Sequence, residues 1–183
     1  TFYTIPTIIK ISHRKNLMNE PEFRSSHLRK IPNLGGIAIF YSIAVCLPVF
    51  AYELFDLYKF LSASLVILLF IGVMDDIVVM RAYKKLIAQI LVSALIVIGS
   101  DVRIRNLFGV FGIYELNYVF SILFSIVTFI IIINAFNLID GIDGLASISV
   151  VISLSAYGVI AYVQNQLDIF LVILAMIGGL LGF

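Results

Sequence analysis

Long apolar runs separated by short polar segments extend along the whole chain. A backbone inside lipid has to satisfy its own hydrogen bonds, and a helix needs about 20 apolar residues to cross a bilayer. We therefore expect each run to form a helix, with the first and last runs incomplete as spans. The runs cover residues 1–11, 35–52, 60–74, about 82–99, 118–133, 145–163 and 169–183.

The amino-acid composition, together with this pattern, indicates an integral membrane protein. Hydrophobic residues make up 62% of the 183 residues and charged residues 13%, whereas soluble domains have about 45–50% apolar and about 25% charged residues. We predict an all-α, polytopic transmembrane helix bundle: one integral-membrane domain, residues 1–183, truncated at both ends and forming the N-terminal part of a larger bundle. The net charge of +1 disfavours a nucleic-acid partner, and Cys46 has no second cysteine for a disulfide.

Basic residues gather in alternate polar segments, which predicts the orientation of the helices. Nine of the twelve Lys and Arg residues lie in or beside the connections after the first and third runs. Cytoplasmic loops carry the excess of positive charge, so we expect the connections after the first, third and fifth runs in the cytoplasm. The nine are Lys10, Arg14, Lys15, Arg24, Arg29, Lys30, Arg81, Lys84 and Lys85, and the remaining three are Lys59, Arg103 and Arg105.

The connection between residues 99 and 118 is then external. Residues 102–105 alternate between apolar and basic side chains, and Gly109 and Gly112 follow. Alternation followed by glycines predicts a small β-hairpin. We expect it to lie on the membrane and to have a structural role.

The stretch before residue 145 carries a polar residue at every third position: Asn134, Asn137, Asp140 and Asp143. Each step of three drifts by about 60° around a helix, so the first three share one side of a helix end. Asp143 stands where a carboxylate can cap the following helix. Capping accounts for Asp143 alone, so the shared register of amides and carboxylates favours a site for a metal–phosphate ligand.

A second acidic pair, Asp75-Asp76, ends the run before the basic third connection. Adjacent carboxylates repel each other, and the negative end of the helix dipole adds to the repulsion. Arg81, Lys84, Lys85 or a bound Mg²⁺, which prefers carboxylate and phosphate oxygens, would stabilise them. A solvated helix end is the alternative. Counting spans places both acidic stretches on one face of the membrane, which favours a shared site.

Three segments resemble the polyprenyl-phosphate N-acetylhexosamine-1-phosphate transferases, in the family's order. They are Pro-x-x-Arg-x-x-His…Ile-Pro-x-Leu-Gly-Gly at residues 21–36, Gly-x-x-Asp-Asp at residues 72–76 with Lys85 and Gln89 downstream, and residues 134–145. Residues 31–36 look like the undecaprenyl-phosphate N-acetylglucosamine-1-phosphate transferase branch. The branch that uses UDP-MurNAc-pentapeptide has a Thr-Pro-Thr-Met-Gly-Gly pattern, which is not present.

The resemblance implies a Mg²⁺-dependent or Mn²⁺-dependent enzyme of the bacterial inner membrane with a cytoplasmic active site. Such an enzyme transfers an N-acetylhexosamine 1-phosphate, GlcNAc-1-phosphate in this branch, from a UDP-sugar to polyprenyl (undecaprenyl) phosphate and releases UMP. The product enters the synthesis of a cell-envelope glycan, such as the cell wall or lipopolysaccharide.

The resemblance also implies roles for individual residues. Asp75 would orient or deprotonate the lipid phosphate, and Asp76 would hold a metal or a lysine. Asn137 and Asp140 would face the metal–diphosphate, with the principal metal-binding Asp expected beyond residue 183. The implied catalytic residues are Asp75, Asp76 and Asp140, the implied metal ligands are Asn137 and Asp76, and the implied substrate contacts are Asn134, Asp143, Lys85, Arg24, His27 and Lys30.

Alternatives to this assignment are a membrane cation transporter and a non-catalytic interaction module. Transporter carboxylates lie near the middle of the membrane, whereas these stand at helix ends, which favours the enzyme. Within the enzyme, a direct transfer and a transfer through an aspartyl-phosphate intermediate both fit the residues.

Overall fold

The computed structural model describes residues 1–15, 18–19, 31–32, 35–50, 55–78, 80–140 and 144–182. Within these residues every long element is a helix, and the two strands have two residues each. The chain divides into two compact units, one of Thr1–Asp56 with Leu138–Phe183 and one of Leu57–Asn137. The prediction of an all-α bundle is confirmed.

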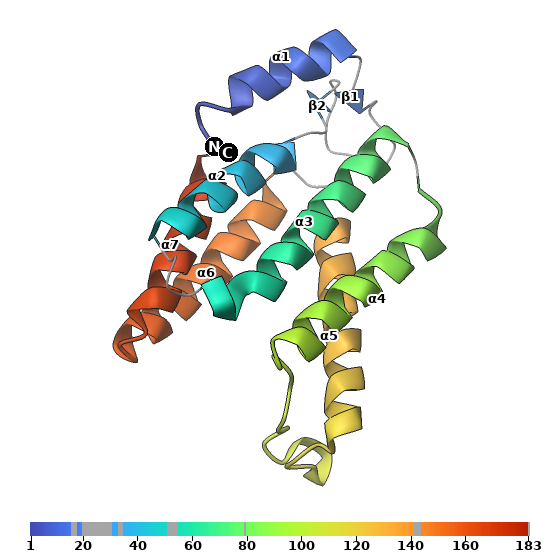
Figure 1. Ribbon diagram of the computed structural model, residues 1–183, viewed down its shortest axis with the longest axis vertical. Coiled ribbons are helices and arrows are strands. Elements are labelled where there is room, and N and C mark those ends of the chain that lie inside the picture. The colour runs from blue at the N-terminus through green and yellow to red at the C-terminus, as the bar shows by residue number, and fades with distance from the viewer. Residues whose placement is uncertain are drawn as a thin grey trace. The chain divides into compact units, whose positions relative to one another are not determined.

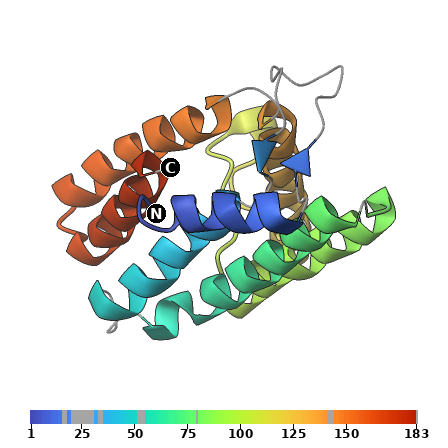
Figure 2. The ribbon, with the colours of Figure 1, turned by 90° about the horizontal axis from the view of Figure 1, so that it is seen from above.

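The first unit is built around α7 (Leu167–Leu181), which packs against α6 (Leu145–Val163) and α2 (Gly35–Phe50). Figures 1 and 2 show these three helices side by side. A Cβ atom on Gly158 of α6 would lie only 3.3 Å from Ile173 of α7. Small residues at such contacts let helix backbones approach closely, which is the usual basis of helix association in membranes.

The remaining elements of this unit precede α2. α1 (Ile5–Lys15) buries Ser12 and leaves Lys10 and His13 exposed. β1 (Met18–Asn19) then pairs antiparallel with β2 (Ile31–Pro32). The polar connection after α1 is therefore tied together near its two ends, which the hydrophobic pattern did not predict.

The second unit contains α4 (Ala82–Gly99) and most of α3 (Phe55–Ile77) and α5 (Tyr118–Ile139). α4 runs antiparallel to α3, and a Cβ atom on Gly99 would lie 2.7 Å from the Phe60 ring. Only glycine therefore allows this approach of the end of α4 to the start of α3. α5 runs back along α4: Gln89 of α4 is hydrogen-bonded to Asn134 near the end of α5, and Ile104, which follows α4, to Ser125 near its start.

Four helices in the described residues are long and apolar enough to cross a membrane. α2 and α7 are shorter apolar helices. The chain is thus a multi-pass membrane protein by the length and composition of its helices. The four candidate spans are Tyr58–Ile77, Ala82–Gly99, Tyr118–Ile139 and Leu145–Val163.

Two helices extend well beyond the predicted runs. α3 covers Phe55–Ile77 where residues 60–74 were predicted, and α5 continues to Ile139 where the run ended at residue 133. An apolar run ends at its first polar side chain, but the backbone hydrogen bonds of a helix do not. Asn134 and Asn137 therefore lie inside α5, in its last two turns.

The connection between α4 and α5 forms a small hairpin turn. Asn106 and Glu115 form a single antiparallel bridge, and the 3-10 helix η2 (Val110–Gly112) closes the tip. Backbone hydrogen bonds join Leu107 N–H to Tyr114 O at 2.8 Å and Gly109 N–H to Ile113 O at 3.0 Å. The predicted hairpin is present, with one bridge in place of regular strands. We call residues 106–115 the hairpin.

Candidate functional site

The C-terminal end of α3 and the N-terminal end of α4 meet at an ion pair. Lys85 Nζ lies 2.5 Å from Asp75 Oδ2, and the side chains are 41% and 25% exposed. Asp75 Oδ1 also accepts a hydrogen bond of 3.1 Å from the backbone N–H of Met80. Of the three cations that could stabilise the acidic pair, Lys85 thus contacts Asp75. Both oxygens of this carboxylate have donors, so it has a fixed position.

An amide pair, of which Gln89 is buried and Asn134 exposed, lies one helical turn further along α4. The Gln89 side chain is 6% exposed, and its Oε1 accepts a hydrogen bond of 2.9 Å from Asn134 Nδ2. Gln89 Nε2 donates to Asn134 Oδ1 at 3.4 Å. Residues four apart share one face of a helix, so Lys85 and Gln89 form a polar stripe on α4. The stripe links α3 to the C-terminal end of α5.

The structure therefore brings together three residues of the predicted site, Asp75, Lys85 and Asn134, within one unit. Asp76 and Asn137 are exposed, the first in the last turn of α3 and the second in the last turn of α5. Asp140 is exposed directly after α5 and belongs to the other unit. Arg24, His27, Lys30 and Asp143 lie outside the described residues.

Gln89 was not among the predicted site residues. Its signal in the sequence is a single amide in the otherwise apolar segment 86–92, four residues after Lys85. The partner of such an amide cannot be read from helical periodicity, because Asn134 lies 45 residues away.

The described residues contain no group of three or more His, Cys, Asp or Glu side chains that could hold a metal ion. Among the predicted site residues that the structure describes, Asp76, Asn137 and Asp140 have exposed side chains with carboxylate or amide oxygens. Carboxylate and amide oxygens are suitable ligands for Mg²⁺, which often keeps several waters and binds through only one or two carboxylates. The donor types suit magnesium, but within the described part of the chain they do not form a complete binding site.

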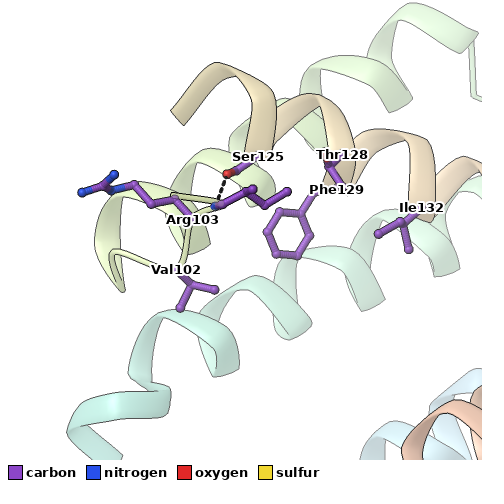
Figure 3. Close-up of a pocket in the computed structure, with 7 residues that line it drawn as sticks. Val102, Arg103, Ser125, Thr128, Phe129 and Ile132 are labelled. Atoms are coloured by element: carbon purple, nitrogen blue, oxygen red, sulfur yellow. Dashed lines mark hydrogen bonds between the residues drawn. The ribbon is translucent and has the colours of Figure 1, made fainter. Parts of the chain in front are cut away.

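A different polar arrangement lies at the other end of α4, where the chain is extended beside α5. Ser125 Oγ accepts a hydrogen bond of 2.8 Å from Ile104 N–H, and Ser121 Oγ donates to Ile104 O at 2.5 Å. Figure 3 shows Ser125 and its neighbours on α5 facing this segment. Val102, Ile104, Phe129 and Ile132 line most of a groove of about 260 Å³ there. The polar residues of its lining are Arg103, Ser125 and Thr128. Both hydroxyl groups donate to carbonyls of α5, and the lining has no carboxylate, imidazole or thiol.

Asp101 stands beside this groove with two arginines. Its carboxylate lies 2.7 Å from Arg103 Nε and 2.6 Å from Arg105 Nη2. The hydrogen bond from Arg103 is the largest cause that lowers the pKa of Asp101 below its ordinary value of 3.8. The Arg103 guanidinium also lies 4.8 Å from the centre of the Tyr118 ring. These contacts order the base of the hairpin.

The chain belongs to glycosyl transferase family 4, whose sequence model matches residues 58–183. Similar proteins from Streptococcus pneumoniae are named phospho-N-acetylmuramoyl-pentapeptide-transferase. Identity is 40% over 206 residues in serotype 19F (strain G54), 39% over 203 residues in strain Hungary19A-6 and 37% over 204 residues in serotype 2 (strain D39). Each match covers 100% of this chain and 60% of the relative. No solved structure matches the chain.

These comparisons confirm the resemblance at the level of the family. The chain spans about 60% of the length of the curated relatives it matches. The relatives are named for the pentapeptide branch, whereas residues 31–36 suggested the N-acetylglucosamine branch. The family model matches the segment that contains both the acidic pair and the polar stretch that follows residue 133. Membership of a transferase family therefore weighs against a cation transporter.

Proposed function

We propose that the whole protein transfers phospho-N-acetylmuramoyl-pentapeptide from UDP-MurNAc-pentapeptide to polyprenyl phosphate and releases UMP. The donor is inferred from the names of relatives that are 37–40% identical. The structural observation that carries the proposal is the Asp75–Lys85 ion pair, which joins the ends of two candidate spans next to the hydrogen-bonded Gln89–Asn134 pair. A charged pair at the end of a span suits a reaction between a lipid phosphate and a water-soluble nucleotide.

The chemistry gives these residues distinct tasks. An oxygen of the lipid phosphate attacks the sugar-bearing phosphorus, a new P–O bond forms, and the bond to UMP breaks. Both reactants are anions, so charge neutralisation and alignment are most of the catalytic work. We assign the lipid phosphate to Lys85, with Asp75 fixing the position of the ammonium group and accepting a proton where the phosphate carries one. Attack by an Asp carboxylate, with an aspartyl-phosphate intermediate, would use the same residues.

The remaining roles follow from the family assignment. Asn137 and Asp76 are our candidates for metal ligands and Asp140 for the diphosphate side of the site. Mg²⁺, or Mn²⁺, would supply charge neutralisation on the diphosphate when bound. Asp143 is assigned to the nucleotide, and Asn134, Arg24, His27 and Lys30 to substrate contacts. The positive-inside count supports a cytoplasmic face for this site, and the bacterial relatives support an inner membrane.

A second donor is supported by one feature of the sequence. Residues 31–36, Ile-Pro-Asn-Leu-Gly-Gly, fit enzymes that use UDP-N-acetylglucosamine, which would lead to lipopolysaccharide or another envelope polysaccharide. We rank it below the pentapeptide donor, because the relatives match along the whole chain and this pattern covers six residues.

A direct assay separates the two donors. Purified whole protein in lipid nanodiscs would receive undecaprenyl phosphate, Mg²⁺ and either UDP-MurNAc-pentapeptide or UDP-N-acetylglucosamine, and UMP release would be measured. The proposal predicts turnover with the pentapeptide donor and little with the other. Turnover with UDP-N-acetylglucosamine alone would establish the second donor. UMP release with neither, from protein that is folded, would refute both.

The role of Asp75 is tested by Asp75→Asn, which keeps size and removes charge. We expect kcat to fall by about 10²-fold or more, the scale for the loss of a positioned acid or base, with little change in donor affinity. Asp168→Asn is the matched control, because Asp168 is an exposed carboxylate in the first turn of α7. Asp143→Asn should instead weaken nucleotide affinity. Near-normal turnover of Asp75→Asn would remove Asp75 from the site.

A further inference from the structure

The tip of the hairpin exposes large apolar side chains. Phe108 is 88% exposed, Phe111 95% and Tyr114 67%. No charged residue occurs between Leu107 and Tyr114. Contiguous exposed apolar groups of this size usually mark a binding surface for a protein or a membrane.

The backbone at the tip holds both phenylalanines in an unfavourable conformation. Phe108 has φ +51° and Phe111 has φ +55°, in the left-handed region that disfavours residues with a Cβ atom. Glycine would adopt these angles without strain, as Gly109 and Gly112 do beside them. Strained positions of this kind persist where the surrounding structure enforces them, and they cluster at functional sites. With their rings almost fully exposed, the two phenylalanines gain little from packing inside the described part of the chain.

The base of the hairpin is fixed beside a candidate membrane span. Ile104 is hydrogen-bonded to Ser121 and Ser125, in the first two turns of α5. Figure 1 shows the hairpin at the end of α5 where that helix begins. Val110 is the fourth residue after Asn106, so at about 3.3 Å per residue the tip lies at most about 13 Å from the Asn106–Glu115 bridge. The tip therefore stays close to the level at which α5 leaves the membrane.

We propose that the hairpin tip inserts Phe108 and Phe111 into the interfacial region of the lipid leaflet next to the start of α5. Phe rings supply the apolar burial, and Tyr114 supplies a ring with a polar end, the type of residue enriched at membrane interfaces. The side chain of Arg105, 62% exposed at the base, suits the phosphate groups of the same leaflet. Contact with lipid would offset the backbone strain, because the two rings leave water. This inference does not depend on the donor or on the catalytic residues.

Spin labels test the insertion directly. Cysteines would be placed one at a time at Phe108, at Phe111 and, as the control, at Glu115, in whole protein without other accessible cysteines, and labelled in phosphatidylcholine nanodiscs. Labels at positions 108 and 111 should collide more with oxygen, which partitions into lipid, than with a water-soluble nickel chelate. The order should be reversed at position 115. Each single substitution leaves the other phenylalanine in place to hold the tip.

Two other outcomes would overturn the proposal. Labels at both tip positions that collide with the nickel chelate as freely as the label at position 115 would place the tip in water. Immobile labels that neither reagent reaches would place it against protein, either a second copy of the chain or another partner. A label at Val110 gives an independent measurement: Phe108→Ser/Phe111→Ser should move it toward water, whereas Phe108→Leu/Phe111→Leu should leave it in lipid. UMP release should be unchanged in the serine variant.

Discussion

Asp75 and Asp101 are both paired with basic side chains, but at opposite ends of the second unit. Asp75 is 25% exposed and fixed by one ammonium and one backbone N–H. Asp101 is 55% exposed and holds two arginines of its own connection. Exposed ion pairs contribute little to stability, because water and salt screen them. The Asp101 pairs therefore order a local segment, whereas the Asp75 pair joins two helices at the proposed site.

The lowered pKa of Asp101 gives a pH dependence that can be measured at the hairpin. A carboxyl group whose pKa is depressed in the folded state contributes stability above its unfolded pKa, and loses it as pH falls through the folded value. A spin label at position 115 should thus keep its mobility from neutral pH down to the ordinary pKa of 3.8 and become more mobile below it. In the Asp101→Asn variant, the mobility of the label at position 115 should be the same at all these pH values. A wild-type label insensitive to acid would contradict this role of Asp101.

The Gln89–Asn134 pair should contribute measurably to stability. Hydrogen bonds between membrane helices contribute about 0.6 kcal/mol on average and up to about 1.7 kcal/mol. We expect Gln89→Leu and Asn134→Leu each to lower thermal stability, and the double variant to lose less than the sum, because the two residues share one interaction. Thermal unfolding of the three variants in one detergent measures this coupling.

Ser93→Ala provides the control for this cycle. Ser93 lies one turn beyond Gln89, is fully buried, and has no hydrogen-bond partner among the described residues. Removal of a hydroxyl group without a partner costs little and can stabilise the fold. Strict additivity of Gln89→Leu and Asn134→Leu would show that the amide pair is not an energetic contact.

At the scale of elements, the hydrophobic pattern predicted helices best where apolar runs are bounded by turn or polar residues. α4 and α6 have the predicted bounds. α3 and α5 are longer than the apolar runs because each helix continues through polar residues at its ends, such as Asn134 and Asn137 in α5. The pairing of β1 with β2 was missed, since strands of two residues leave no periodicity to detect.

Ser121 and Ser125 explain how an extended segment can run beside a membrane helix. Backbone groups that lack water need protein partners, and these two hydroxyl groups satisfy both the N–H and the C=O of Ile104. Ser125→Ala should leave the Ile104 N–H without its acceptor, at a cost of about 1–3 kcal/mol.

Hydrogen exchange of the segment 100–117 measures this effect locally. Protection of the Ile104 amide should be lost in Ser125→Ala. Ser153→Ala is the matched control, because within the described residues the Ser153 hydroxyl donates to Ser149 O of its own helix and to no backbone group outside it. Equal protection of Ile104 in both variants would show that the hydrogen bond from Ile104 N–H to Ser125 is not needed to hold this segment.

At the scale of the whole molecule, the sequence identified the residues of the candidate site better than their contacts. Spacing and resemblance named Asp75, Lys85 and Asn134, which lie together. Spacing could not predict that Lys85 rather than Arg81 or Lys84 contacts Asp75, because all three are near in sequence and the choice depends on how α4 packs against α3. The partner of Gln89 depends in the same way on the packing of α5. Long-range pairs of this kind come from tertiary structure alone.

The orientation of the second unit in the membrane is open to a direct test. α4 has 18 residues, about 27 Å at 1.5 Å per residue, close to the thickness of the hydrocarbon core. If α4 spans the bilayer, we expect Ala82 and the hairpin at opposite faces of the membrane. Three basic residues, Arg81, Lys84 and Lys85, lie near Ala82 in the sequence, against two acidic residues, Asp75 and Asp76. Over the whole chain, nine basic residues fall on the predicted cytoplasmic side and three on the other side. The positive-inside rule predicts that Ala82 is on the cytoplasmic side. In intact cells, a cysteine at the exposed position Ala82 should be shielded from an impermeant thiol reagent, and one at Glu115 should react, with the two reacting equally after the membrane is permeabilised. The reverse pattern would put Asp75 and Lys85 outside the cell, where UDP-sugars are not made, and would refute the proposed site.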